Sequence, residues 1–444
     1  MLKNTIYALS TPFISSAIAI VRVSGSEALN SLRLIAKREN WTSHKASHCN
    51  IYDKNGEVLD NALVLYFEEG KSYTGEILVE YHIHGSTAVI KDLLQTLSTM
   101  PGHRMALAGE FTRRALENGR LDLIQAEGIA DLIAAETTMQ RKQSLRELQG
   151  EVGSRYLEWG ELLKETLALV ESTIDFSDED IPAETFTIAN NNMASLIVQM
   201  EKEIQNGKKA KKLREGISIA ILGSPNVGKS SLINYLSQKD VAIVSNIAGT
   251  TRDVIEVFLD IGGFPVAIAD TAGIRESEDI IEKEGVKRAI AQAETADIKI
   301  LMLDSTDPSP VMPTQLGIYI EQNTFVLINK IDVNPTVIPP QVGSRHYLVS
   351  VKNGTGLADF EKDLTAELAK ITALHENPIV LQERHNEIMQ HCLNELQLAL
   401  ENNYDTIICA FHLRAALNNI GKILGKTDIE EILDIIFGRF CIGK

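Results

Sequence analysis

Residues 223–231, GSPNVGKSS, have the types and spacing of a phosphate-binding loop. Gly223 and Gly228 allow the backbone to wrap around phosphate groups, and the helix that follows presents unpaired N–H groups to them. Lys229 supplies a positive charge to the outer phosphates, and the hydroxyl of Ser230 is suited to ligate Mg²⁺. Because an apolar strand directly precedes the loop, the segment predicts a nucleoside triphosphate site and not a chance glycine turn.

Two further segments are predicted to surround the outer phosphates. The segment DTAG, residues 270–273, ends an apolar strand, so that Asp270 can hold the Mg²⁺ shell and the N–H of Gly273 can meet the γ-phosphate. The segment GTTRD, residues 249–253, lies between a loop and a strand. One of its threonines is placed to close on Mg²⁺ in the triphosphate state.

The segment NKID, residues 329–332, predicts that the base is guanine. The carboxylate of Asp332 can accept the ring and exocyclic N–H groups of guanine, while Asn329 meets the opposite edge. Adenine offers the wrong donors, and a site built to pair polar groups rejects such an analogue strongly. The segment SVK, residues 350–352, is placed to support the base from behind.

Hydrolysis requires an arrangement that differs from that of a Ras-like enzyme, in which a glutamine after DTAG orients the attacking water. Here Ile274 takes that place, and its side chain cannot orient water. Asn226 could instead hold a monovalent cation beside the phosphates, in place of an arginine finger. The acidic stretch 275–285 offers carboxylates for the water, Glu282 among them. The alternative interpretation of this stretch is a solvated helix start.

The chain shows three kinds of sequence pattern, and the strands and helices that they predict must position these residues. Residues 1–118 mix short strand-like and helical runs and predict a small α+β domain. Residues 214–376 alternate buried strands with helices, as in a mostly parallel Ras-like α/β domain. Residues 119–213 and 377–444 have the spacing of amphipathic helices. We therefore predict a multidomain chain in which the α/β domain is inserted into one helical bundle domain. The basic stretch 207–216, GKKAKKLREG, is interpreted as a solvated linker in preference to a nucleic-acid patch.

Composition limits the function classes. The 444 residues contain 43 basic and 60 acidic side chains, a net charge of −17, which argues against a surface coated for phosphate binding. Contacts to nucleic acid would have to be local or come from a partner. Four cysteines without CxxC spacing fit reduced thiols in the cytoplasm. No unbroken apolar run approaches the ~20 residues of a membrane helix, so we expect a soluble cytoplasmic protein without a membrane partner.

The motifs together resemble the tRNA-modification GTPase MnmE (TrmE) family. The resemblance is carried by GSPNVGKSSLINYL, SNIAGTTRD, DTAGIRE, RVSG, SYTGEILVEYHIHG and the terminal FCIGK, and it runs from NTIYALSTP to the last lysine. It implies a homodimer with a folate-binding, dimerising amino-terminal domain, a helical domain and an inserted G domain. Its partner would be MnmG (GidA), which brings FAD and NADH and forms a heterotetramer with it.

The resemblance also implies a reaction and a set of site residues. The family adds a carboxymethylaminomethyl or aminomethyl group to C5 of the wobble uridine of certain tRNAs, using a one-carbon unit from 5-formyl- or methylene-tetrahydrofolate. The implied ligands of K⁺ are Asn226, Ser245, Ile247 and Thr250, those of Mg²⁺ are Ser230 and Thr251, and the implied water-activating carboxylate is Glu282. The implied folate contacts are Arg22, Glu80, Arg120 and Lys444. The residues expected to bind GTP are Asn226, Val227, Gly228, Lys229, Ser230, Ser231, Ser245, Asn246, Ile247, Ala248, Gly249, Thr250, Thr251, Asp270, Thr271, Ala272, Gly273, Asn329, Lys330, Asp332, Ser350, Val351 and Lys352.

Cys441 lies three residues from the end of the sequence. The apolar run EEILDIIFGRF would hold the tail down almost to its last residues, and the resemblance places the tail near the folate site. Our hypothesis is that Cys441 acts in the modification step, as a nucleophile or one-carbon handler. A stray thiol on a loose tail is the alternative. One departure from the family is the segment 11–17, TPFISSA, where relatives usually carry a glycine-rich PPGRGG-like loop.

Two alternative functions share the G motifs. A ribosome-assembly GTPase of the Era or Der type would carry an RNA-binding KH domain or a second G domain downstream, whereas the segment downstream of 376 is short and helical. A regulatory GTPase would open and close a helical dimer as a switch without carbon chemistry. Folate binding by the isolated protein would distinguish the tRNA-modifying function from this one.

Overall fold

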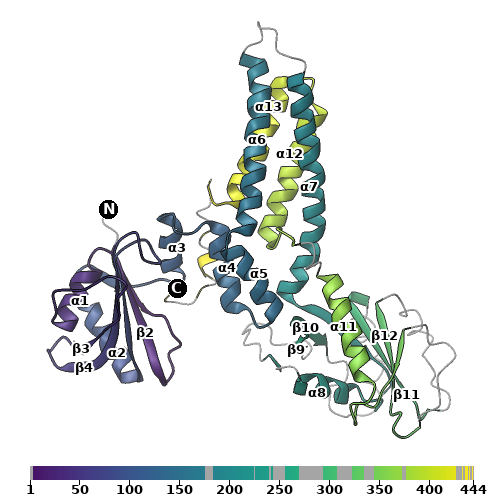
Figure 1. Ribbon diagram of the computed structural model, residues 1–444, viewed down its shortest axis with the longest axis horizontal. Coiled ribbons are helices and arrows are strands. Elements are labelled where there is room, and N and C mark those ends of the chain that lie inside the picture. Colours follow the sequence, from purple (N-terminus) through teal and green to yellow (C-terminus); the bar gives the residue numbers. More distant parts are fainter. Residues whose placement is uncertain are drawn as a thin grey trace, which may run out of the picture. The chain divides into compact units, whose positions relative to one another are not determined.

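The structure is a computed structural model (Figure 1). The chain divides into two compact units. One unit comprises residues 1–133, 145–165 and 414–444, and the other comprises residues 134–144 and 166–413. The residues that the structure describes are 4–175, 184–224, 226–239, 242–243, 256–269, 294–307, 323–334, 345–372, 377–426, 433, 436–438, 440 and 443.

The amino-terminal part of the first unit is an α+β fold, as predicted. Its six-stranded sheet has the order β3-β4-β5-β2-β1-β6, antiparallel except for the β1–β6 pair. The strands are β1 (Thr5–Leu9), β2 (Ser16–Ser24), β3 (Ser47–Tyr52), β4 (Val58–Phe67), β5 (Leu78–Gly85) and β6 (His103–Met105). The helices are α1 (Ala28–Ala36), α2 (Thr87–Ser98) and α3 (Glu110–Glu117).

The two faces of this sheet differ in what they bury. On one face, apolar residues of α1 and α2 pack against alternate residues of β2 and β5, such as Val21, Val23 and Tyr81. Side chains in a strand point to opposite faces in turn, so Arg22 and Glu80 belong to the other face. There, Phe111 of α3 packs beside Ile6 and Ala8 of β1.

Within the described residues, six long helices belong to the helical part of the chain (Figure 1). In the second unit, α7 packs against α12, and the two are joined by a hydrogen bond of 3.3 Å from Gln397 to Glu201. In the first unit, Leu123 and Ala126 of α4 pack against Phe437 and Phe440 near the carboxyl terminus. The helices are α4 (Leu123–Ala134), α5 (Thr138–Leu148), α6 (Glu151–Asp175), α7 (Glu184–Glu215), α12 (Glu383–Glu401) and α13 (Thr406–Ile423).

The linker predicted at 207–216 is wrong, because all but its last residue form the final turns of α7. Cations are favoured at the carboxyl end of a helix, where the carbonyl dipoles point outward. Two of the lysines also have acidic partners from distant parts of the sequence. Lys211 forms an ion pair of 2.6 Å with Glu383, and Lys212 pairs with Asp297.

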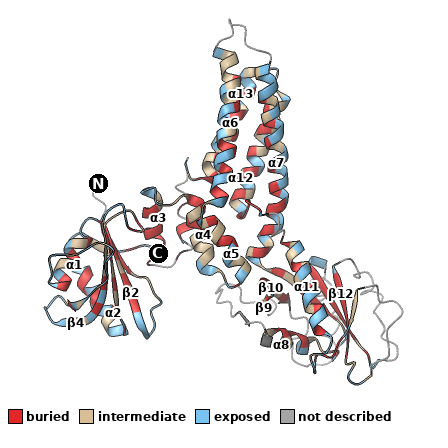
Figure 2. Cartoon of the chain, viewed as in Figure 1, coloured by how far each residue is buried: buried red, intermediate tan, exposed pale blue. Residues whose placement is uncertain are grey.

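The second unit contains the predicted α/β sheet, with the order β13-β12-β11-β7-β10-β9-β8. Pairing is parallel from β13 to β10 and antiparallel from β10 to β8. Buried residues line its central strands (Figure 2), as the continuous apolar runs predict. The elements are β7 (Ile217–Leu222), α8 (Lys229–Lys239), β8 (Ala242–Ile243), β9 (Glu256–Ile261), β10 (Phe264–Ala269), β11 (Ile298–Asp304), β12 (Thr324–Asn329), β13 (His346–Leu348) and α11 (Leu357–Ile371).

Candidate functional site

The phosphate-binding loop joins β7 to α8, and its glycines are required by both conformation and space. Gly223 and Gly228 have φ values of 147° and 110°, in the region that favours glycine. A Cβ atom on Gly223 would lie 2.5 Å from the carbonyl oxygen of Met302. One on Gly228 would lie 2.4 Å from Nδ2 of Asn329. The loop therefore keeps an open backbone, as the wrapping of phosphate groups requires.

Lys229 is the first residue of α8, and its ammonium group lies against the loop. The Nζ atom donates hydrogen bonds of 2.6 Å to the carbonyl of Gly223 and 2.9 Å to that of Ser224. The side chain therefore curls back over the backbone that would surround the phosphates. Ser230 follows in the first helical turn and is exposed. A lysine and a serine at a helix amino terminus suit a phosphate with bound Mg²⁺.

Asn226 lies within the same loop in the left-handed conformation, with φ of 59°. Asparagine adopts this conformation more readily than most residues. Its side chain is exposed, so its amide oxygen is accessible from solvent at the phosphate loop. This placement is compatible with the predicted cation ligand, which stays a prediction.

Asn329, the last residue of β12, connects the phosphate loop to the base-recognition segments. Its Nδ2 atom donates to the carbonyl of Val227 at 2.8 Å, and its Oδ1 atom accepts from the N–H of Val351 at 3.0 Å. The side chain is only 4% exposed. Asn329 therefore holds two distant loops together, a role that sequence reasoning missed. Its contact with the base edge stays a prediction.

The segment after β12 carries the predicted guanine-binding carboxylate. Oδ1 of Asp332 accepts a hydrogen bond of 2.7 Å from the hydroxyl of Ser350, so two of the predicted base-binding segments meet. Lys330 has φ of 66° and forms an ion pair of 2.6 Å with Asp304 at the end of β11. Burial raises the pKa of Asp304, but the hydrogen bonds from Lys330 and Thr306 outweigh it and hold that pKa below its usual value.

Ser231 in α8 and Lys352 after Val351 are both exposed. Twelve further predicted nucleotide and hydrolysis residues lie outside the described part of the chain. They are Ser245, Asn246, Ile247, Ala248, Gly249, Thr250, Thr251, Asp270, Thr271, Ala272, Gly273 and Glu282. Cys441 and Lys444 lie outside it as well.

On the amino-terminal sheet, the strand register brings Arg22 and Glu80 together. They are directly opposite on β2 and β5, and Nε of Arg22 lies 2.8 Å from Oε1 of Glu80. The guanidinium carbon of Arg22 lies 5.6 Å from the centre of the Tyr73 ring. His82 approaches the other carboxylate oxygen of Glu80 at 3.4 Å. Both charged side chains are partly exposed, at 21% and 17%, so the pair is accessible to a ligand.

Arg120 lies beside the loop that also carries Tyr73. A Cβ atom on Gly75 would lie 3.2 Å from Cγ of Arg120. Gly75 has φ of 78°, which favours glycine. Three of the four predicted folate residues are thus described. The loop that carries Tyr73 and Gly75 lies against both Arg22 and Arg120.

The carboxyl-terminal tail returns to this domain. The carbonyl of Gly443 accepts a hydrogen bond of 3.0 Å from the hydroxyl of Ser10, just after β1. A Cβ atom on Gly443 would lie 2.2 Å from the carbonyl oxygen of Leu9, and its φ is 102°. Glycine is therefore required for the close approach. Phe440 is buried in the cluster formed with α4.

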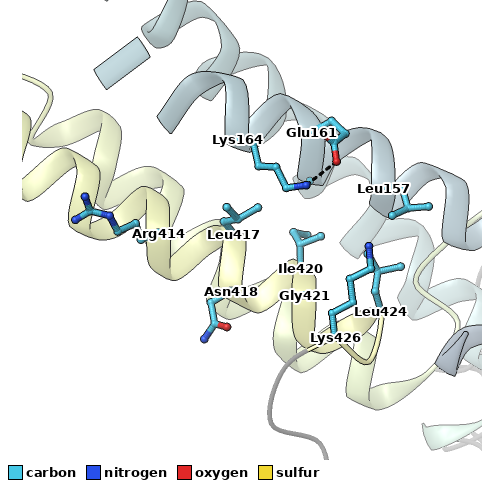
Figure 3. A pocket seen from close by; sticks show the side chains of 11 residues that line it. Leu157, Glu161, Lys164, Arg414, Leu417, Asn418, Ile420, Gly421, Leu424 and Lys426 are labelled. Atoms are coloured by element: carbon cyan, nitrogen blue, oxygen red, sulfur yellow. Dashed lines mark hydrogen bonds and ion pairs between the residues drawn. The ribbon is translucent and has the colours of Figure 1, made fainter. Parts of the chain in front are cut away.

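A separate cavity of about 330 Å³ lies between α6 and α13 in the first unit (Figure 3). Its lining combines apolar side chains such as Leu157 and Ile420 with the cations Lys164, Arg414 and Lys426. No residue predicted to act on nucleotide or folate lines it.

Two family models match the chain. The model described as "GTP-binding protein TrmE N-terminus" matches residues 5–120, and the one described as "MnmE helical domain" matches residues 123–441. Among curated proteins, the tRNA modification GTPase MnmE of Rickettsia rickettsii (strain Sheila Smith) is 42% identical over 446 residues, covering 99% of this chain and 100% of the relative. That of Parvibaculum lavamentivorans is 41% identical over 453 residues, with the same shares.

Solved structures also match parts of the chain. Era of Aquifex aeolicus is 28% identical, with a TM-score of 0.27, and the match covers 34% of this chain and 56% of that one. Among the residues that the structure describes, no helix combines the length and apolar character needed to cross a membrane. The full-length relatives and the family models agree. The chain therefore belongs to the MnmE (TrmE) family of tRNA modification GTPases, and it is a GTP hydrolase that acts in tRNA modification.

Proposed function

We propose that this chain is a potassium-stimulated GTPase that modifies the wobble uridine of certain tRNAs together with an MnmG-type FAD protein. The group added to C5 is carboxymethylaminomethyl or aminomethyl, and its one-carbon unit comes from a tetrahydrofolate derivative. The observation that carries the folate part is the accessible Arg22–Glu80 pair on the amino-terminal sheet.

The nucleotide site has a chemically consistent set of groups. The open glycine backbone and Lys229 would hold the phosphates, and the carboxylate of Asp332 would pair with guanine. Ser230 and Thr251 would hold Mg²⁺. Asn226, with Ser245, Ile247 and Thr250, would hold K⁺, which supplies the positive charge that an arginine finger provides elsewhere. Glu282 would position the attacking water.

The folate site is consistent with the chemistry of its ligand. A pterin ring offers N–H donors, which suit the half-buried carboxylate of Glu80. The glutamate tail of folate is anionic and suits cations, which Arg22, Arg120 and Lys444 would provide. The hydrogen bond from Ser10 to Gly443 brings the tail to the amino-terminal domain at Gly443. We accordingly keep Cys441 as the proposed nucleophile or one-carbon handler of the modification step.

We infer a cytoplasmic homodimer that binds tRNA as a complex with its FAD- and NADH-dependent partner. The net charge of −17 supports a division of labour in which the partner carries much of the RNA binding.

The decisive test is mass analysis of wobble uridines in tRNA from cells that lack this gene. Unmodified uridine is expected in these cells. The modification should be restored by the wild-type gene but not by the Arg22→Ala or Cys441→Ser variant. Measuring tetrahydrofolate binding by the purified wild-type and variant proteins distinguishes a loss of folate binding from a general loss of activity. Normal modification in the deletion strain would overturn the proposal.

A further inference from the structure

Asp304 is a carboxylate that no G motif includes, yet it lies next to the base-recognition segment. It is the last residue of β11 and pairs directly with Asn329, the last residue of β12. The N–H of Ser305 donates 2.9 Å to the carbonyl of Asn329, so the two strand ends are tied together. The carboxylate is therefore beside the point where the chain leaves the sheet toward Asp332.

The two oxygens of Asp304 have separate partners. Oδ1 accepts hydrogen bonds from the N–H and the hydroxyl of Thr306, at 2.9 and 2.6 Å. Oδ2 accepts from Nζ of Lys330 at 2.6 Å. Thr306 thus fixes the orientation of the carboxylate, and the carboxylate in turn fixes the end of the Lys330 side chain. Groups held in advance in this way lose less freedom when a ligand binds.

Lys330 needs such a restraint because of its backbone. Its φ of 66° lies in the left-handed region, which is uncommon for a residue with a Cβ atom. The turn that follows is closed by a bond of 2.9 Å from the N–H of Val333 to the carbonyl of Lys330. Because Asp332 lies within this turn, its carboxylate depends on the conformation of Lys330.

We propose that Asp304 is a positioning residue for guanine recognition, acting through its ion pair with Lys330. The inference rests on the guanine site proposed above. Asp304 touches neither base nor phosphate in this scheme, and it holds the side chain of Lys330 across the carboxyl edge of the sheet. Losing it should weaken the binding of GDP and GTP to a similar degree, because both carry the same base.

The test is a double-mutant cycle on the full chain, measured with fluorescently labelled GDP and GTP. Asp304→Asn keeps an oxygen for Thr306 but removes the charge that holds Lys330. We expect about fivefold weaker binding of both nucleotides, the size typical of a partly exposed ion pair. The KM for GTP should rise by the same factor while kcat stays unchanged.

Coupling distinguishes positioning from a general structural role. In a chain with Lys330→Met, adding Asp304→Asn should cause no further loss, because the partner is already gone. Losses that multiply in the double variant would overturn the inference. Asp304→Glu retains the charge and should recover part of the affinity. Asp359→Asn, an exposed carboxylate at the start of α11, is the matched charge control and should bind normally.

Asp332→Asn separates this inference from the guanine site itself. If this substitution leaves the preference for guanine over xanthine nucleotides unchanged, the base assignment fails. If the preference changes but Asp304→Asn binds normally, only the role of Asp304 fails.

Discussion

The nucleotide site and the folate site proposed on the amino-terminal sheet are built on opposite principles. The phosphate loop depends on the absence of side chains at Gly223 and Gly228, since a Cβ atom on either would collide with neighbouring atoms. The folate site depends on two side chains, Arg22 and Glu80, which strand pairing places opposite one another. A backbone site is sensitive to any added atom, whereas a side-chain site is sensitive to the loss of particular atoms. Substitutions can therefore separate the two sites.

Gly228→Ala is expected to have the largest effect. The new Cβ would lie 2.4 Å from Nδ2 of Asn329 and would also occupy a φ of 110°. We expect nucleotide affinity to fall on the order of a hundredfold, because the clash displaces the phosphate loop and its link to the base segments. Titration with labelled GDP measures it. Gly102→Ala is the control, since that glycine has φ of 75° but nothing within 4 Å of an added Cβ. It should bind nucleotide normally, and an equal loss in both variants would contradict the clash argument.

The cation argument predicts the next largest effect. GTP hydrolysis should be about tenfold or more faster in KCl than in NaCl at equal ionic strength, because K⁺ would neutralise developing charge at the phosphates. Asn226→Gly should remove most of the difference, since glycine accepts φ of 59° but lacks the amide. Steady-state phosphate release measures both. Equal rates in the two salts for the wild-type chain would exclude the cation role.

Arg22→Ala should weaken tetrahydrofolate binding by about tenfold or more, because a hydrogen bond to a charged group contributes ~1.5–3 kcal/mol. Calorimetric titration of the purified chain measures the affinity, and GTP hydrolysis should change little. Arg33→Ala on α1, an arginine whose ion pair with Glu39 is looser at 3.7 Å, serves as the control. If both arginine variants lose folate equally, the assignment of the sheet face is wrong.

The smallest effect is expected at the tail. Ser10→Ala removes the hydrogen bond to Gly443, which contributes about 1 kcal/mol. If the tail holds Cys441 at the folate site, as proposed, alkylation of Cys441 should become about fivefold faster when this hydrogen bond is lost. Peptide mass mapping gives the rate at each cysteine, and Cys392, which is buried in α12, provides the internal reference. Ser98→Ala on α2 removes a comparable hydroxyl bond within a helix and should leave the rate unchanged.

The sequence predicted what residue type alone can reveal. The phosphate loop could be predicted because its backbone conformation requires glycines and its ligand requires a lysine, and both follow an apolar strand. The role of Asn329 was missed because its partner Val227 lies 102 positions away and offers only a carbonyl, which every residue has. The linker at 207–216 was predicted wrongly for a similar reason. The local composition of this stretch does not show that Glu383 and Asp297, from distant parts of the sequence, form ion pairs with lysines in the last turns of α7.

The Arg22–Glu80 pair also bears on how the amino-terminal sheet is assembled. The register of β2 against β5 shifts between Ser16 and Ala19, so strand pairing tolerates an irregularity just before the pair. A one-residue slip of β2 farther along would turn Arg22 toward the core, away from Glu80, and would expose Val21 and Val23 in exchange. Burying unpaired charge is costly, so the slipped pairing is disfavoured during folding. Arg22 and Glu80, which are proposed to bind a ligand, thus also favour the correct register of β2 with β5.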